Sequence, residues 1–282
     1  MDDPLVSGGF MLLICLGVTV VMQCSFFVVA YTCQFDKVTD LAGALNFIVL
    51  AVLSLVLQGV YDTRAIVTTS LQVAWALRLG CFLFVRVLKR GKDARFDEMR
   101  ANCTAFFGFW VFQILWVFLV SLPTVLANSS GEREDSSFGE PRDIVGVVLW
   151  AVGLAVEVAA DTSKSAFNDE LANKGKLLRS GVWKYSRHPN YFGEMPHLHL
   201  PGAHVPLGRA TAEDRYDERF GLDPDYVEYK RSTSPLVLFP PALYRSIPDP
   251  IKRWCFFELD RYSRKLRELR DTEHKTNYQA IP

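Results

Sequence analysis

The sequence predicts an all-α membrane protein, with a bundle of about five transmembrane helices followed by a polar, cytoplasmic C-terminal part. Two observations lead to this prediction. Half of the 282 residues are apolar, and they are concentrated in roughly the first 160 positions, whereas charged residues dominate the remainder. Five apolar segments in the first part have about the 20 residues that an α-helix needs to cross a bilayer, although the fifth is shorter.

The five predicted spans lie at residues 10–31, 41–60, 65–88, 106–126 and 144–160. Only Asp2 and Asp3 carry charge before the first span, so it lacks the positive region of a cleaved signal peptide, and we expect it to be retained. The second span is uninterrupted. The third contains two arginines, the fourth ends near Pro123, and the fifth contains Glu157.

The loops between the spans predict an orientation. Lysines and arginines follow the third and fifth spans, whereas residues 131–140 between the fourth and fifth spans are acidic. By the positive-inside rule, the N-terminus is then outside and the C-terminus is cytoplasmic, and we expect the endoplasmic reticulum rather than another membrane. The net charge of zero gives no support for nucleic-acid binding. The expected partner is the lipid bilayer, and the oligomeric state stays open.

Four polar residues continue the fifth span as a stripe. Glu157, Asp161, Lys164 and Asn168 recur at i, i+4, i+7 and i+11, which places them on one narrow helical face. Because the stripe begins inside the apolar segment, it suggests a hydrated pocket that opens to the cytoplasm. The alternative is a solvated helix end with intrahelical ion pairs.

The run at residues 181–194 is the densest group of functional side chains. It reads Gly-Val-Trp-Lys-Tyr-Ser-Arg-His-Pro-Asn-Tyr-Phe-Gly-Glu. Pro189 suits the first position of a helix, and a helix N-terminus offers free N–H groups and partial positive charge to a phosphate. Arg187 adds a bidentate phosphate donor, while Tyr191 can stack on a base. No Gly-x-Gly-x-x-Gly or Walker pattern occurs, so no Rossmann domain is expected.

This run resembles the C-terminal signature of the steroid 5-alpha-reductase superfamily, and it is especially similar to that superfamily's uncharacterised multi-span branch. Residues 75–96, 161–167 and 226–229 look like further elements of the same branch. The resemblance covers about residues 40–245, apart from one gap.

The resemblance implies a membrane oxidoreductase that uses NADPH to reduce a carbon–carbon double bond in a hydrophobic lipid or steroid-like substrate. Carried over to this sequence, the residues lining the NADPH site would be Asp161, Lys164, Arg187, His188, Asn190, Tyr191 and Glu194. The proton donor is not evident, with Tyr61 and Glu157 as weak candidates. The alternatives are an S-adenosylmethionine-dependent membrane methyltransferase of the isoprenylcysteine carboxyl type and a non-catalytic membrane protein.

The sequence departs from the family after Glu194. Pro196 is expected to stop the helix that begins at Pro189, and a span-sized piece is expected to have been lost or replaced. We therefore divide the chain into a bundle at 1–194, an atypical Pro/His-rich segment at 195–220, and a polar tail at 221–282 with an amphipathic helix. The histidines of the middle segment match no usual zinc spacing, so no metal site is expected. Reductase activity is expected to be weak or absent.

Overall fold

The computed structural model describes residues 6–33, 38–59, 61–90, 102–129, 138–198 and 205–259, together with residues 263, 266 and 268. Regular structure in this part of the chain is helical, with one isolated bridge between Ser186 and Ser234, which confirms the all-α class. The chain forms two compact units. The bundle unit comprises Met1–Trp150 with His197–His199, and the C-terminal unit comprises Ala151–Pro196 with Leu200–Pro282.

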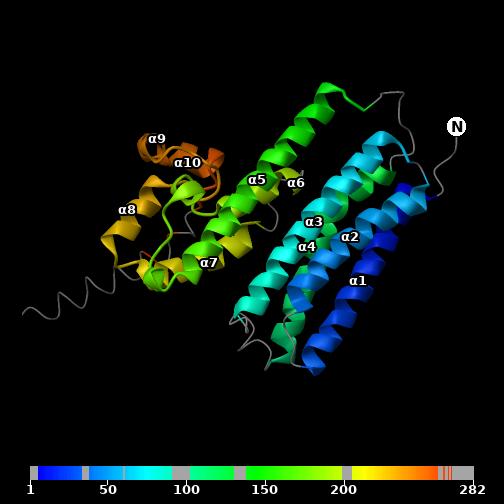
Figure 1. Cartoon of the computed structure of the whole chain (residues 1–282), viewed down its shortest axis with the longest axis horizontal. Helices are drawn as coiled ribbons and strands as arrows, with labels where there is room; N and C mark the ends of the chain where they lie inside the picture. Colours follow the sequence, from blue (N-terminus) through cyan, green and yellow to red (C-terminus); the bar gives the residue numbers. More distant parts are fainter. Residues whose placement is uncertain are drawn as a thin grey trace, which may run out of the picture. The chain divides into compact units, whose positions relative to one another are not determined.

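Five long helices correspond to the five predicted spans (Figure 1). Each is long and apolar enough to cross a membrane, which confirms those predictions. Apolar side chains on their outer faces, such as Leu13 at 64% and Val21 at 66% exposed, are expected of a protein surrounded by lipid. The helices are α1 Gly8–Thr32, α2 Val38–Gln58, α3 Thr63–Arg90, α4 Cys103–Ser129 and α5 Pro141–Asp169.

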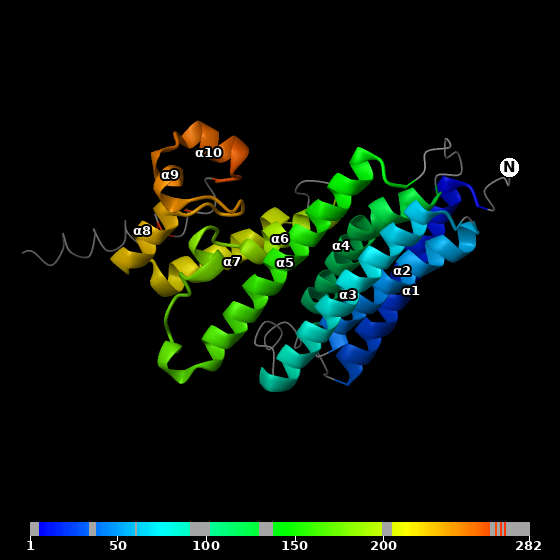
Figure 2. The ribbon, with the colours of Figure 1, turned by 45° about the horizontal axis from the view of Figure 1, so that its top comes forward.

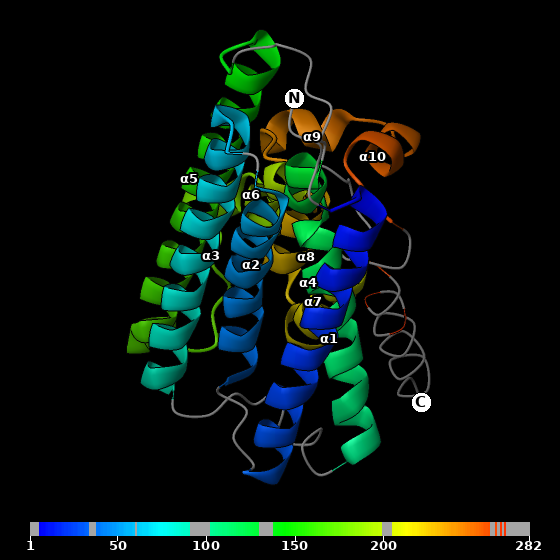
Figure 3. The same ribbon diagram turned by 90° about the vertical axis from the view of Figure 1, so that its right-hand side faces the viewer.

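The bundle unit is built from α1 to α4, which run side by side in Figures 2 and 3. Phe47 of α2 packs edge-on against Trp116 of α4 and tilted against Trp75 of α3, with ring centroids 5.0 and 5.1 Å away. A side chain at Gly80 would place its Cβ 2.9 Å from the Cβ of Ala44. The glycine therefore allows α2 and α3 to approach closely, as small residues commonly do in membrane bundles.

Neutral polar side chains fill part of the bundle interior. Gln23 Nε2 donates to Asn46 Oδ1 over 2.9 Å and joins α1 to α2. Asn128 Nδ2 donates to Ser54 Oγ at 2.9 Å and to Thr69 Oγ1 at 3.1 Å, which joins three helices. Such hydrogen bonds satisfy groups that the hydrocarbon region would otherwise leave without partners.

Ion pairs of the bundle unit lie near helix ends. Arg86, in the last turns of α3, donates to Asp40 in the first turn of α2 over 3.0 Å. At the opposite end of α3, Arg64 pairs with Asp143 in the first turn of α5 over 2.8 Å. Arg86–Asp40 joins the end of α3 to the start of α2, and Arg64–Asp143 joins the starts of α3 and α5. A charge near a helix end costs less than one at the bilayer centre.

The C-terminal unit contains the remainder of α5 followed by short helices. Its elements are the 3-10 turns η1 Leu171–Asn173 and η2 Gly181–Lys184, then α6 Pro189–Leu198, α7 Val205–Phe220, α8 Pro224–Ser232, α9 Pro241–Ser246 and α10 Asp249–Cys255. The predicted amphipathic helix at 251–275 overlaps the end of α10, and most of it lies outside the described residues.

α6 begins at Pro189, as predicted, but it does not stop at Pro196 and instead ends at Leu198. The prediction of the stop was wrong. A proline removes one hydrogen bond and crowds the carbonyl four residues earlier, but α6 includes Pro196 only two residues before its end. Among the described residues after α5, no helix is long and apolar enough to cross a membrane.

Candidate functional site

Two predicted elements meet where α5 faces η2. The indole Nε1–H of Trp183 donates to the carbonyl of Ala160 over 3.0 Å. Lys164, one turn further along α5, places its Nζ 4.5 Å from the centroid of the Trp183 ring and 5.8 Å from that of Tyr216. The cation therefore lies over aromatic faces, which attract it electrostatically. The fold thus brings the polar stripe of α5 next to the run at residues 181–194.

α6 packs directly against α5 through Gly193. A Cβ at this position would lie 2.6 Å from the carbonyl oxygen of Gly153 and 2.8 Å from the amide nitrogen of Glu157. These distances leave no room for any side chain, so the glycine is required by the close approach of two backbones. Glu157, which is 1% exposed, lies at this contact and is sealed from solvent.

The residues before α6 are held by hydrogen bonds to backbone carbonyls of a segment far along the chain. The amide of Arg187 donates to the carbonyl of Ser234 over 2.8 Å, and the hydroxyl of Ser186 donates to the carbonyl of Leu236 over 2.7 Å. The same hydroxyl accepts the amide of His188 over 3.1 Å. The position of the Arg-His pair is therefore fixed by the segment that follows α8.

Arg187 is 5% exposed and lies between two carboxylates. Its Nη1 donates to Glu213 over 3.2 Å, and its Nη2 donates to both oxygens of Glu258 at 2.6 and 2.7 Å. Burial alone lowers the pKa of the guanidinium, but the two carboxylates outweigh burial and hold that pKa above its usual range. Within the described part of the chain, the Nε of Arg187 has no hydrogen-bond partner.

Glu213 connects Arg187 to two further side chains. Its Oε1 lies 2.7 Å from His188 Nε2, and its Oε2 lies 3.1 Å from Lys230 Nζ. Since a carboxylate only accepts, the imidazole carries its proton on Nε2. Burial lowers the pKa of His188 below its usual value despite this carboxylate, which favours the neutral ring. Burial raises the pKa of Glu213, but Arg187 and the hydrogen bond from His188 pull it below its usual range.

Lys230 and Tyr226 of α8 extend the network to Asp217 of α7. Asp217 Oδ1 accepts from Lys230 Nζ over 2.6 Å and from the hydroxyl of Tyr226 over 2.5 Å. We call the whole set the buried charge network. It consists of Arg187, His188, Glu213, Asp217, Tyr226, Lys230, Tyr244 and Glu258.

A left-handed residue precedes the last carboxylate of this network. Phe257, directly after the turn that closes α10, has a φ of 59°, which is uncommon for an aromatic residue and marks a tight reversal of the chain. The amide of Glu258 then donates to the carbonyl of Lys252 over 3.1 Å, and Tyr244 donates its hydroxyl to Glu258 Oε2 over 2.7 Å. The reversal holds the Glu258 carboxylate against Arg187.

The seven predicted cofactor residues divide into two groups. Arg187 and His188 are buried within the network. The other five are half-buried around α5 and the start of α6, namely Asp161, Lys164, Asn190, Tyr191 and Glu194. Tyr191 stacks on His188 with ring centroids 5.5 Å apart. Of the two weak proton-donor candidates, Glu157 belongs to the C-terminal unit, and Tyr61 lies in the bundle unit with 58% of its surface exposed.

Sequence reasoning missed the partners of Arg187. Glu213 and Asp217 stand four residues apart on α7, and Tyr226 and Lys230 stand four residues apart on α8. This spacing places the two residues of each pair on one helical face, and it could have indicated that they lie side by side. The separation of 26 residues between Arg187 and Glu213, and of 71 between Arg187 and Glu258, left no local pattern that would connect them.

Comparison with known proteins gives one family and one curated relative. A family described as a protein of unknown function (DUF1295) matches residues 26–199. A protein named probable O-methyltransferase ustE, from Ustilaginoidea virens, is 29% identical over 73 residues, which are 26% of this chain and 26% of that protein. The chain thus aligns with about a quarter of the relative's length. No solved structure matches. The family match includes Arg187 and His188 but ends before Glu213.

Proposed function

Because this chain belongs to the DUF1295 family and carries five helices able to span a membrane, we propose that it is a membrane enzyme that binds a nucleotide cofactor beside the start of α6. More finely, and following the resemblance noted above, we propose NADPH-dependent reduction of a carbon–carbon double bond in a lipid or steroid-like substrate. In this proposal the cofactor surface faces the cytoplasm, where soluble nucleotides are found.

The observation that carries the proposal is the position of Lys164 over Trp183 at 4.5 Å. It brings one cation of the α5 stripe to the aromatic run that precedes α6, although the two residues are 19 positions apart. Half-buried Asn190 and Tyr191 follow on the first turn of α6. A cation, an amide and an aromatic face are the groups that recognise phosphate, sugar hydroxyls and a planar ring.

These residues fit a nucleotide on the surface between α5 and α6. Lys164 would bind a phosphate, Asn190 and Glu194 would bind sugar hydroxyls, and Tyr191 would stack on a ring. NADPH, when bound, would supply a hydride to the substrate. Gly193 keeps α6 against α5 and thereby keeps water away from Glu157.

Arg187 fits a phosphate less well than its sequence context suggests. Its terminal nitrogens already bind Glu213 and Glu258, and it is 5% exposed. A phosphate would have to displace a carboxylate that makes a charge-assisted hydrogen bond of 2.6 Å. We therefore assign Arg187 and His188 to holding the start of α6 in place, and expect turnover by this chain to be slow.

A second candidate is an S-adenosylmethionine-dependent methyltransferase, and one observation favours it. The curated relative carries the name probable O-methyltransferase.

Thermal unfolding of the purified full-length protein in detergent, with NADPH or S-adenosylmethionine added, tests both candidates. A ligand that binds only the folded state stabilises it by about 2.7 kcal/mol at 100 times its Kd, so the matching ligand will raise the melting temperature. We expect NADPH to do so. A rise with S-adenosylmethionine alone would support the methyltransferase, and no rise with either ligand would contradict both.

A pair of lysine variants locates the binding site in the same experiment. Lys164→Ala should abolish most of the NADPH shift, because Lys164 provides the proposed phosphate contact. Lys176→Ala removes an exposed lysine of the same unit and should leave the shift unchanged. Equal shifts in both variants would exclude the α5–α6 surface as the cofactor site.

A further inference from the structure

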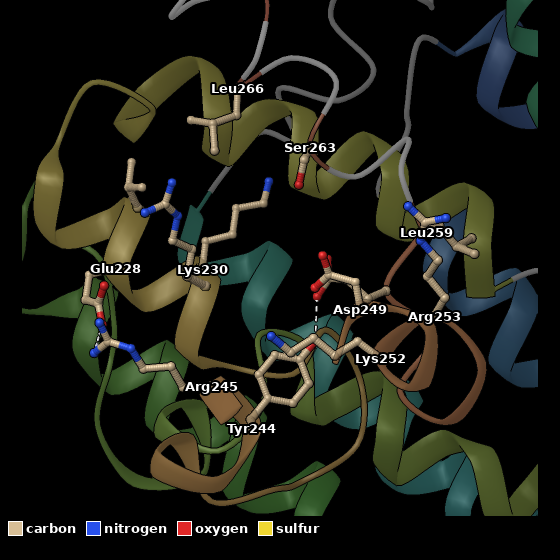
Figure 4. A pocket seen from close by; sticks show the side chains of 13 residues that line it. Glu228, Lys230, Tyr244, Arg245, Asp249, Lys252, Arg253, Leu259, Ser263 and Leu266 are labelled. Atoms are coloured by element: carbon tan, nitrogen blue, oxygen red, sulfur yellow. Dashed lines mark hydrogen bonds and ion pairs between the residues drawn. The ribbon is translucent and has the colours of Figure 1, made fainter. Parts of the chain in front are cut away.

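A pocket of 510 Å³ opens in the C-terminal unit, away from Lys164 and Trp183, between α8, α9, α10 and the residues that follow α10 (Figure 4). Its size lies within the range of small-molecule sites. The pocket is lined by Val227, Glu228, Lys230, Arg231, Tyr244, Arg245, Asp249, Lys252, Arg253, Glu258, Leu259, Ser263 and Leu266.

The lining has an excess of positive charge. Five lysines and arginines face three carboxylates. Two of these carboxylates are already bound, since Glu228 pairs with Arg245 over 2.8 Å (Figure 4) and Glu258 binds Arg187, which is not part of the lining. Two of the cations are bound as well, namely Arg245 in that pair and Lys230 by Asp217 outside the lining. Clefts with a surplus of one sign concentrate ligands of the opposite sign. The pocket is therefore suited to an anion with more than one negative charge.

Two cations stand out as ligands for such an anion. Neither Arg231 nor Lys252 is a side-chain partner of Glu228 or Glu258. The Nζ of Lys252 lies 4.9 Å from the centroid of the Tyr244 ring, and that ring is fixed because its hydroxyl donates to Glu258. Lys252 is thus held at the pocket wall. Arg231, at the end of α8, is exposed and offers the planar fork that binds phosphate oxygens in pairs.

The remaining lining favours an organic phosphate over a bare ion. Val227, Leu259 and Leu266 contribute apolar surface, and Ser263 contributes a hydroxyl. The pocket volume is many times the volume of about 30 Å³ that one water molecule occupies in the liquid, so it leaves room for an organic group beside the phosphate. We propose that this pocket binds the phosphate group of an organic phosphate monoester, with Arg231 and Lys252 as its principal ligands. The proposal does not depend on the cofactor proposed for the α5–α6 surface.

The same chemistry is available from a soluble nucleotide and from a phosphorylated lipid headgroup. Calorimetric titration of the full chain in detergent with AMP, and separately with water-soluble dibutanoyl phosphatidylinositol 4-phosphate, distinguishes these sources. Adenosine and dibutanoyl phosphatidylinositol serve as the phosphate-free controls. Tighter binding of one phosphorylated probe than of its control supports the proposal and names the source. Absence of binding by both phosphorylated probes at millimolar concentration overturns it.

Variants then tie the binding to the pocket. The double change Arg231→Ala with Lys252→Ala should lower the affinity at least tenfold and leave the melting temperature without ligand unchanged. Arg179→Ala removes an exposed arginine that pairs with Asp225 outside the pocket, and it should leave the affinity unchanged. Equal loss in both variants overturns the proposal. Should the double variant fail to fold, Arg231→Gln alone, which keeps an amide in place, must still lower the affinity.

Discussion

The two units bury polar groups in opposite ways. Inside the bundle unit the buried hydrogen bonds join neutral groups, such as Gln23 to Asn46 and Asn128 to Ser54, and its ion pairs lie near helix ends. Inside the C-terminal unit, Arg187 and Lys230 bury full charges against carboxylates. The neutral interior of the bundle is expected of helices that face lipid, because a lipid-embedded charge has no water to return to when its partner moves.

The comparison predicts where a single substitution is most damaging. A hydrogen bond between neutral groups contributes modestly to the free energy of unfolding, whereas removing one member of a buried ion pair leaves an uncompensated buried charge. The most sensitive positions should therefore lie in the C-terminal unit, although the bundle contains most of the apolar residues.

The largest effect is expected for Glu213→Ala. This change leaves both Arg187 and Lys230 buried with fewer carboxylates, and loss of one partner of a buried pair costs about 3–5 kcal/mol. The melting temperature in detergent should fall accordingly. Glu228→Ala is the matched control, because it breaks the exposed pair with Arg245, which contributes about 0–1 kcal/mol. Equal decreases in melting temperature for Glu213→Ala and Glu228→Ala would contradict the greater sensitivity of the buried ion pairs.

Gly193→Ala should have the next largest effect. The new Cβ would lie 2.6 Å from the carbonyl oxygen of Gly153, so α6 must move away from α5, and overpacking of this kind costs about 1–3 kcal/mol. Gly146→Ala, in α5 with no atom within 4 Å of the added Cβ, should instead be neutral or slightly stabilising. The melting temperature should fall in the Gly193→Ala variant and stay the same or rise slightly in the Gly146→Ala variant. An equal fall in both variants would contradict the close contact at Gly193.

Acidification should affect the C-terminal unit first. The pKa of His188 is lowered below its usual 6.5, so the unfolded chain binds a proton that the folded chain does not, and stability falls as the pH drops below 6.5. The lowered pKa of Glu213 adds a further loss below pH 4.5. Each group contributes at most about 1.4 kcal/mol per pH unit. In the His188→Gln variant, the melting temperature should fall less between pH 6.5 and pH 5 than it does in the unchanged protein. An equal fall in both proteins would rule out His188 as the cause.

The smallest effect is expected for Asn128→Ala in the bundle. The change removes hydrogen bonds to Ser54 and Thr69, and such interhelical bonds contribute about 0.6 kcal/mol on average and about 1.7 at most in membrane proteins. SDS titration of the folded protein measures the difference. A loss as large as that of Glu213→Ala would mean that neutral pairs in lipid are as critical as buried charges.

Most of the fold could be predicted from the sequence. Each apolar segment of about 20 residues became one helix, because a bilayer requires this length and permits no irregular exposed backbone. Pro189 marked the start of α6 correctly, since its fixed φ and missing N–H suit the first helical position. The prediction from Pro196 was wrong, because α6 includes this proline two residues before its last residue, where little helix remains to be disrupted.

The candidate site could be predicted only in part. The two motifs that contain Lys164 and Trp183 could be identified from the sequence, but the contact between the two residues was seen only in the structure. The burial of Arg187 did not, because a phosphate-binding arginine and a paired structural arginine look alike in sequence, and only the contact partners distinguish them. Those partners come from α7 and from the chain reversal at Phe257, which no local pattern connects to Arg187.

The contact between Arg187 and Glu258 also has a consequence for biosynthesis. The two residues are 71 positions apart, and ribosomes add about 5–20 residues per second. Each new chain therefore completes its arginine roughly 4–14 s before the second carboxylate exists. Glu213, 26 positions after Arg187, is completed earlier, and until Glu258 is made it is the only one of these two carboxylates that Arg187 can bind. Chaperones and membrane-insertion factors would meet this intermediate on every round of synthesis, and a pause in translation between the two codons would lengthen its exposure.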